Sequence, residues 1–425
     1  MSLPSWMQTT RASAAALLVL ITVQSAVRAE TPGFDAAPDL PPRAEVERIL
    51  ANRAEVKAAQ AELEAEQARR RRLEVGIYEP VVRAGTQQRR VSDVPARWTE
   101  WSLGLERALR VGDKARLDAS LGEQGVRLAR SMVGEARHEA ARQLLDAWFS
   151  ALREAEIARA WQAQRSVLDA QRDALTRRLR AGDASRLELQ QVEAAWQQVE
   201  AQRVLAEGRA AQSTAEFARR YGFAPPDGLA VAGIAPIETE AAPWIARVLE
   251  ASHELAAARD ASALARLQAE RADAERRPDP TVGVHLGSER GGVERILGLA
   301  VSVPLPGAAR QATVEVVTAQ ARAAAAREAA VRRRIEVEVE GGVRRVVSAR
   351  EGWERLTDAA DRLEQAATLT GRAWTLGEGS LGDWLAARRV AAEARIAERS
   401  ARVDAAQFRY RLLLDAHLLW DLDVD

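Results

Sequence analysis

A glycine-rich segment is the first pattern in this sequence that could carry chemistry. Residues 377–382 read Gly-Glu-Gly-Ser-Leu-Gly and match the G-x-G-x-x-G fingerprint of dinucleotide sites. That fingerprint requires a preceding strand within a βαβ unit, whereas a long helical pattern precedes it here. We therefore predict a glycine-rich turn in which Ser380 caps the next helix, with Asp383 completing a variant of the capping box.

The residues that most often serve catalysis or metal binding are sparse. The sequence has no cysteine and only four histidines. The lack of cysteine excludes a thiolate nucleophile, a thiolate zinc site and a disulfide. The pairs His138-Glu139 and His253-Glu254 lack the second histidine of a zinc-peptidase motif. We predict that the chain is not an enzyme and uses no metal or other cofactor.

The remaining candidate chemistry is electrostatic. Asp183, Glu378 and Asp383 stand at two predicted turns between helices. If several copies of the chain surround one opening, these carboxylates would form a gate that attracts cations and responds to pH or divalent ions. The alternative is that they are ordinary acidic residues near helix N-termini, where negative charge is favourable.

Composition limits the class of protein. The 425 residues include 61 basic and 61 acidic side chains, and only 4% are aromatic. A nucleic-acid-binding protein needs a basic excess, so the balanced charge argues against that class. Long stretches rich in Ala, Arg, Glu, Gln and Leu favour long helices over a compact mixed core.

The N-terminus has the features of an export signal. Arg11 supplies positive charge, residues 12–23 are apolar, and small residues stand at the −3 and −1 positions before Glu30. The apolar run is shorter than the roughly 20 residues that a membrane-spanning helix needs. We predict a cleaved signal peptide over residues 1–29. No later stretch of the sequence approaches such a helix, so any crossing of a membrane would require β-strands.

The rest of the chain contains an internal duplication, in which similar segments recur about 195 residues apart. The segment 179–189 reappears as 374–384, with glycine, acid and serine in matching places. The segment 101–109 likewise resembles 297–305. The predicted boundaries are a signal peptide at 1–29, a linker at 30–42, a first repeat at 43–221, an inter-repeat linker at 222–241, a second repeat at 242–420 and a tail at 421–425.

Each repeat is predicted to hold a helix, a β-hairpin, a very long helix, a turn and a returning helix. Apolar residues alternate with small or polar ones over the predicted strands, which is the pattern of a strand with two different faces. The four strands are expected at about 77–87, 99–109, 280–288 and 295–303, with a polar loop over 88–97. The long helical patterns follow at Gly112–Arg180 and Gly307–Leu376, with a local kink expected at Gly341-Gly342.

The returning helices share a seam with alternating three- and four-residue spacing, which predicts left-handed coiled packing. The seam residues are Leu189, Val192, Trp196, Val199, Arg203, Ala206, Ala210, Ser213 and Phe217, then Trp384, Ala387, Ala391, Ala394, Glu398, Ala401, Ala405, Phe408 and Leu412. Arg203 and Glu398 are the only charged members and occupy equivalent positions. We predict that they pair between neighbouring helices and fix their register.

Four strands cannot close a barrel, and an open sheet edge in lipid leaves costly unpaired amides. Strands that span a membrane would therefore have to come from several chains. Three chains give twelve strands, with a matching tube of helices. All strands must cross in the same sense, so the symmetry is cyclic. The fold class predicted is mainly α with a small β part, duplicated within the chain.

On these residues the chain resembles the TolC-like outer-membrane efflux family along nearly its whole mature length. The resemblance rests on the duplication, on the strand start at 277–284 (RPDPTVGV), on the strand exit at 299–307 (LAVSVPLPG) and on the paired turns at 181–185 and 376–380. It implies a homotrimer with a 12-stranded barrel in outer-membrane lipid, continued by a periplasmic α-helical barrel. The first repeat has Arg110-Val111-Gly112 in place of the proline and glycine of that exit.

The resemblance also implies a function and partners. The duct would passively export small solutes or metal cations that an inner-membrane pump of the resistance-nodulation-division type delivers through a periplasmic adaptor (membrane fusion) protein. It places adaptor docking at the periplasmic tip, on Gly182, Asp183, Ser185, Gly377, Glu378, Gly379 and Ser380. The strand start favours the heavy-metal cation branch. The alternatives are a type I secretion exit duct and an exported coiled-coil scaffold or adaptor.

Overall fold

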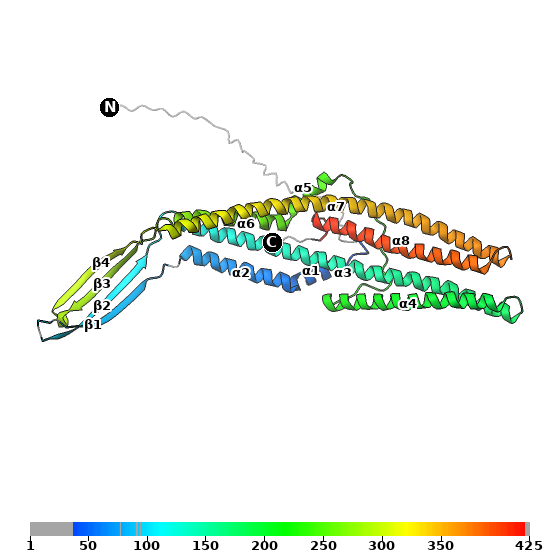
Figure 1. Ribbon diagram of the computed structural model, residues 1–425, viewed down its shortest axis with the longest axis horizontal. Helices are drawn as coiled ribbons and strands as arrows, with labels where there is room; N and C mark the ends of the chain where they lie inside the picture. The colour runs from blue at the N-terminus through cyan, green and yellow to red at the C-terminus, as the bar shows by residue number, and fades with distance from the viewer. Residues whose placement is uncertain (1–36, 77, 91, 94, 421–425) are drawn as a thin grey trace, which may run out of the picture. The chain divides into compact units, whose positions relative to one another are not determined.

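A computed structural model describes residues 37–420 of the chain, except residues 77, 91 and 94. The predicted signal peptide, the first part of the predicted linker and the predicted tail lie outside the described residues. The described chain contains helices and one antiparallel sheet, and the sheet lies at one end of the long helices (Figure 1). None of the described helices has an apolar stretch that could span a bilayer.

The sheet combines one hairpin from each repeat. Strands β1 (Val81–Arg90) and β2 (Arg97–Ala108) form the first hairpin, and β3 (Thr281–Glu289) and β4 (Glu294–Ser302) form the second. A short 3₁₀ helix, η2 (Arg290–Gly292), links β3 and β4. The order is β1-β2-β3-β4, with every neighbouring pair antiparallel. The β2–β3 pairing therefore joins the two repeats into one sheet.

The first hairpin differs from its expected boundaries. Strand β1 starts at Val81 rather than near residue 77, directly after Pro80, which has no N–H to donate to a ladder. It also runs to Arg90, so the loop is shorter than the expected 88–97. Polar residues that suggested a loop pair across the sheet instead: Gln88 pairs with Thr99, and the Arg89 guanidinium lies 3.1 Å from the Glu100 carboxylate.

The two faces of the sheet differ in chemistry. One face is apolar and exposed in the single chain, with Leu299 83% exposed. Its members share register across all four strands: Val82, Ala84, Leu103, Leu105, Val282, Val284, Leu286, Leu297, Leu299 and Val301. The opposite face carries ion pairs such as Arg83–Glu106 at 2.9 Å and Arg89–Glu289 at 3.1 Å.

Six helices build most of the remaining chain. The first repeat supplies α2 (Ala54–Val75), α3 (Lys114–Arg180) and α4 (Arg186–Tyr221), and the second supplies α6 (His253–Ala274), α7 (Ala308–Thr375) and α8 (Leu381–Asp415). At about 1.5 Å per residue, α3 with 67 residues and α7 with 68 are each about 100 Å long. Helix α7 continues through Gly341 and Gly342 without a break.

The packing follows the duplication. Helix α3 packs against α2, α4, α6 and α8, and α7 packs against α6 and α8. The predicted seam residues of α4 and α8 are all buried or half-buried. The turns α3–α4 and α7–α8 lie at the end of the helices opposite the sheet (Figure 1).

The largest core lies around the middle of α3, where α8 ends and the short helices α1 (Arg43–Asn52) and α5 (Ala241–Ala251) pack. Asp39 is 1% exposed there and joins three distant segments. Its carboxylate accepts hydrogen bonds from Tyr410 Oη at 2.7 Å and from Ala232 N at 3.1 Å, and its carbonyl accepts one from Trp148 Nε1 at 2.8 Å. The N-terminal segment, the inter-repeat linker and α8 are therefore tied to one another.

Candidate functional site

The α3–α4 turn contains the first group of predicted tip residues, and all of Gly182, Asp183 and Ser185 are exposed. Gly182 has φ +81°, a left-handed conformation that favours glycine. The Gly182 N–H donates to Leu179 O at 3.1 Å and the Asp183 N–H to Arg178 O at 2.8 Å, which is the Schellman pattern of a helix end. Ser185 then starts α4 in a capping box with Glu188.

The α7–α8 turn repeats this geometry 195 residues later. Gly377 has φ +82°, and the Glu378 N–H donates to Ala373 O at 2.9 Å. Ser380 Oγ caps α8 by accepting from Asp383 N at 3.0 Å, as the sequence predicted. The two turns are therefore structurally equivalent, and Gly377, Glu378, Gly379 and Ser380 are all exposed.

The structure brings the two turns into contact, which the sequence did not indicate. Trp374 and Trp384 stack with ring centroids 5.9 Å apart. Trp374 Nε1 lies 3.4 Å from a carboxylate oxygen of Glu188 in the other turn, and Arg178 lies over the Trp374 ring at 5.6 Å. These residues sit on a small apolar core with Leu168, Leu175, Val192 and Leu381. The spacing Ser185-x-x-Glu188 was a visible capping signal that would have singled out Glu188.

The charge around the turns is mixed. Asp183, Glu378 and Asp383 are exposed, but so are Arg178, Arg180, Arg186 and Arg372. Asp383 also accepts a hydrogen bond from the Ser380 hydroxyl at 2.7 Å, which supports its interpretation as a helix cap. The carboxylate gate remains a prediction that rests on Asp183 and Glu378.

The two charged seam residues have separate partners within the chain. Arg203 bonds Glu200 at 2.7 Å and also Glu207, both on its own helix. Glu398 is 6% exposed and accepts from Trp353 Nε1 on α7 at 3.1 Å. The structure does not bring Arg203 and Glu398 together in one chain, and their pairing between chains stays a prediction.

A buried ionic cluster, absent from the predictions, joins the sheet to the helices. Lys114 at the start of α3 is 1% exposed. Its ammonium group donates to Asp279 Oδ1 at 2.8 Å and to Arg277 O at 2.7 Å. The hydroxyl of Tyr78 donates to Asp279 Oδ2 at 2.7 Å, and Val111 N donates to Oδ1 at 3.0 Å. Asp279, just before β3 of the second repeat, therefore holds three groups of the first repeat.

The pKa values in this cluster follow from burial and hydrogen bonding. Burial, together with the hydrogen bond to Asp279, raises the pKa of Tyr78 to about 12. Burial acts to raise the pKa of Asp279 as well, but the bonds from Lys114, Tyr78 and Val111 outweigh it and lower that pKa. Asp279 is thus held as a carboxylate that accepts a hydrogen bond from a neutral Tyr78.

Within residues 37–420, gaps excepted, no group of three or more histidine, aspartate or glutamate side chains is placed to hold a metal ion. What the described chain offers is a two-faced sheet, helices about 100 Å long and a pair of equivalent exposed turns.

Solved structures share this architecture at low sequence identity. The outer-membrane channel OprN is 18% identical, with 88% of this chain and 89% of OprN covered at a TM-score of 0.74. The CmeC outer membrane channel of Campylobacter jejuni is 12% identical over 90% of this chain and 87% of its own, at 0.72. VceC from Vibrio cholerae is 16% identical over 89% of this chain and 96% of its own, also at 0.72.

Sequence comparison adds no further relative: no protein-family model matches the chain, and no curated protein matches it. The likeness in structure nevertheless covers 88% of this chain for OprN and 89% for VceC, which is more than either repeat alone. The chain has the fold of outer-membrane channel proteins.

Proposed function

We propose that this chain is a TolC-like outer-membrane duct of a tripartite efflux system, and that it acts as a passive conduit rather than as an enzyme. In this proposal three chains form a 12-stranded barrel in the outer membrane and a helical barrel in the periplasm. A cleaved signal peptide directs export. An inner-membrane pump and a periplasmic adaptor supply energy and substrate.

The observation that carries the proposal is the two-faced sheet with two open edges. Its continuous apolar face is exposed in the single chain, and strands β1 and β4 each have one neighbour only within the described sheet. Pairing of β4 with β1 of the next chain would satisfy these edges, and closure after three chains would leave none. The apolar face would then contact lipid, and the face with Arg83, Glu100 and Glu106 would line the lumen.

The paired turns are proposed as the adaptor-docking tip. Their glycines, Gly182 and Gly377, hold two equivalent exposed loops at the end of the helices opposite the sheet. Leu187 and Leu376 are exposed there, by 63% and 74%, and add apolar surface for a partner. The mixed arginine and carboxylate charge would select the partner's orientation.

The first experiment determines mass and compartment together. The full precursor is expressed, the outer-membrane fraction is extracted in detergent, and the intact complex is weighed by native mass spectrometry. We expect three processed chains from the outer membrane. A monomer or dimer in the soluble periplasm would replace the duct with the exported coiled-coil scaffold.

Docking is tested by crosslinking on the cysteine-free chain. Single cysteines at Asp183 and Glu378 carry a photoactivatable crosslinker, and Glu351→Cys, exposed on the long helix α7, is the matched control. We expect adaptor crosslinks from the two turn positions and few from the control. Equal yields at all three positions would contradict docking at the tip.

Two finer assignments belong to the same proposal. The resemblance of the strand start at 277–284 to the heavy-metal branch supports metal cations as a cargo, beside small solutes. A type I secretion duct would share the fold and differ in its inner-membrane partner. Identification of the pump that copurifies with a crosslinked complex separates these two functions.

A further inference from the structure

Three of the four histidines meet in space although they are far apart in sequence. His138 lies on α3, His253 is the first residue of α6, and His417 follows α8. The His417 ring centroid lies 5.2 Å from that of His138 and 5.0 Å from that of His253. The fourth, His285, is on β3. We call His138, His253 and His417 the histidine cluster.

The elements that carry the histidine cluster pack closely together. His138 is 3% exposed. A Cβ atom at Gly134 would lie 2.5 Å from His253 Nδ1, so only glycine leaves room for that ring against α3. The three elements that carry the histidines are therefore in direct contact.

His417 also sets the course of the chain end. Its φ of +53° is left-handed, a conformation that is strained for a residue with a Cβ. The turn is closed by hydrogen bonds from His417 N to Leu414 O at 3.0 Å and from Leu418 N to Leu413 O at 2.8 Å. It returns Leu419 and Trp420, 0% and 5% exposed, to the main core. Contacts of the His417 ring help to hold this strained turn.

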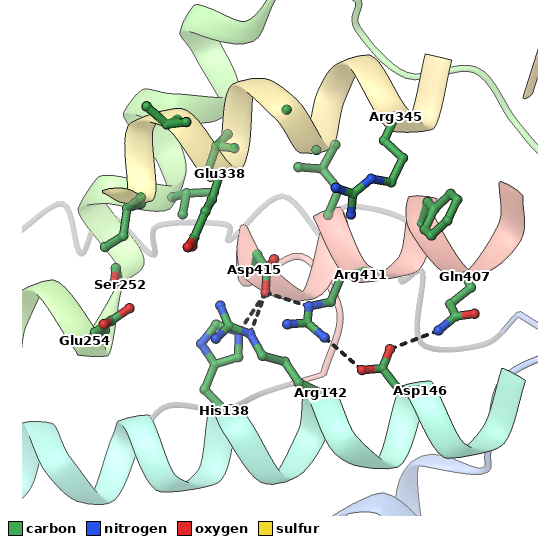
Figure 2. Close-up of a pocket in the computed structure, with 18 of the residues that line it drawn as sticks. His138, Arg142, Asp146, Ser252, Glu254, Glu338, Arg345, Gln407, Arg411 and Asp415 are labelled. Atoms are coloured by element: carbon green, nitrogen blue, oxygen red, sulfur yellow. Dashed lines mark hydrogen bonds and ion pairs between the residues drawn. The ribbon is translucent and has the colours of Figure 1, made fainter. Parts of the chain in front are cut away.

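His138 and several charged side chains line a cavity of about 480 Å³ (Figure 2). Asp415 Oδ1 lies 3.3 Å from His138 Nε2, 2.8 Å from Arg142 Nε and 3.4 Å from Arg411 Nε. The charged groups that line this cavity with His138 are Glu135, Arg142 and Asp146 on α3, Glu254 on α6, Glu338 and Arg345 on α7, and Arg411 and Asp415 on α8. Glu139 and Arg334 lie close enough to Glu135 to act on its charge. Asp415 also contacts Arg142 and Arg411, so its charge is shared and compensates a proton on His138 only in part.

We propose that the histidine cluster is a proton-sensitive latch, which holds the C-terminal turn against α3 and α6 near neutral pH and loosens it on mild acidification. Protonated rings about 5 Å apart repel one another, and a half-buried site screens that repulsion poorly. An opened turn would expose the rings to water, where they accept protons without this cost.

The direction of the effect follows from proton linkage. Burial lowers the pKa of His138, although Asp415 opposes it, so the closed state binds protons less readily than the open state. The closed turn is therefore most stable at pH values above the ordinary pKa of histidine, and its stability decreases as the pH falls through that pKa. Asp415 keeps its charge in this range, because contacts with His138 and Arg142 outweigh burial and lower its pKa.

Glu135 acts in the opposite direction. Burial raises the pKa of Glu135, so its protonation on acidification removes a cost of the closed state and offsets part of the histidine effect. Glu135→Gln would remove that compensation. The variant is therefore expected to show a steeper loss of closure with falling pH than the natural chain.

Hydrogen exchange of the full chain in detergent tests the latch. Exchange of peptides that cover residues 411–420 is measured at about pH 7.5 and about pH 5.5 and normalised to intrinsic rates at each pH. We expect normalised exchange to rise about threefold or more at the lower pH. A peptide around Trp148 in the main core reports that the fold is intact, because its exchange should stay slow.

Variants separate the cluster from a general acid effect. His417→Asn removes the titrating ring and keeps a residue that tolerates the left-handed conformation. It should abolish the rise, as should His138→Gln, while the matched control His285→Asn should retain it. A rise of the same size in both cluster variants, or no rise in the natural chain, would overturn the latch.

Discussion

Lys114 and Asp279, 165 residues apart in the sequence, form a buried ion pair with Nζ 2.8 Å from Oδ1. The pair lies where α3 of the first repeat meets the start of β3 in the second. Lys57 and Lys114 are the only lysines among 61 basic residues, so a lysine is an unusual choice in this chain. A compact ammonium suits several acceptors around one point, whereas the flat fork of arginine suits two parallel ones.

Loss of Asp279 is expected to destabilise the chain strongly. Asp279→Ala would leave the Lys114 charge buried with poorer compensation, which typically costs about 3–5 kcal/mol of unfolding free energy. The measurement is chemical denaturation of the purified complex. Asp273→Ala is the matched control, because Asp273 is exposed and pairs with Arg276 at 3.3 Å. Equal losses for the two variants would contradict a structural role of the buried pair.

The left-handed glycines of the two turns should respond alike to substitution. Gly182→Ala and Gly377→Ala would each place a Cβ in a conformation that costs about 1–2 kcal/mol. Gly208→Ala is the control, because Gly208 lies within α4 with open space around it, and alanine favours a helix by about 1 kcal/mol there. Thermal unfolding measures all three. If only one turn variant lost stability, the two turns would not be equivalent.

Glu188 should stabilise both turns at neutral pH. Its pKa is lowered by the hydrogen bond from Ser185 N, with help from the Ser185 hydroxyl and Trp374. A lowered carboxyl pKa means that the contribution is present above the ordinary glutamate range and is lost as pH falls through it. Glu188→Ala should cost about 1 kcal/mol.

Hydrogen exchange of residues 182–190 measures the loss of stability of the α3–α4 turn. The exchange should rise in Glu188→Ala and less in Glu188→Gln, which keeps an acceptor for Ser185 N. Glu216→Ala, on the exposed surface of α4, is the control. Unchanged exchange in Glu188→Ala would show that the capping box does not hold this turn.

Glu398 offers a test of two different roles. As an acceptor for Trp353 Nε1 within the chain, it should tolerate glutamine, while Glu398→Ala should cost about 1–3 kcal/mol through the orphaned indole N–H. As a partner of Arg203 between chains, it should instead require charge. The double swap Arg203→Glu with Glu398→Arg would then restore trimer yield lost in the single variants. Trimer yield on native gels separates the two roles, and absence of rescue dismisses the pair between chains.

Ion selectivity tests the carboxylate gate. In planar bilayers with reconstituted trimers, Asp183→Asn and Glu378→Gln should reduce cation preference, because each removes three carboxylates from one opening. Asp383→Asn should have less effect, since Asp383 is engaged by Ser380 as a helix cap. The reversal potential in a salt gradient gives the selectivity. No change in the Asp183 and Glu378 variants would remove the gate hypothesis.

The sequence by itself determined the elements of this protein. Alternation such as Val282-Gly283-Val284 marks a strand because successive side chains point to opposite faces. The two turns are predicted by a short motif of glycine, acid and serine that recurs at 182–185 and 377–380. These patterns are local, so they can be recognised in the sequence without knowledge of the fold. The loop predicted at 88–90 was wrong, because polar residues of β1 such as Arg89 find their partners only across the hairpin.

Only the tertiary structure decided which distant side chains meet. Lys114 with Asp279, Glu188 with Trp374, and the histidine cluster each join residues more than a hundred positions apart. No periodicity encodes such contacts, because they depend on the register with which helices about 100 Å long lie against one another. A shift by one helical turn would separate every one of these pairs. That register comes from the packing of many buried residues at once, around Trp148 and Phe149 above all.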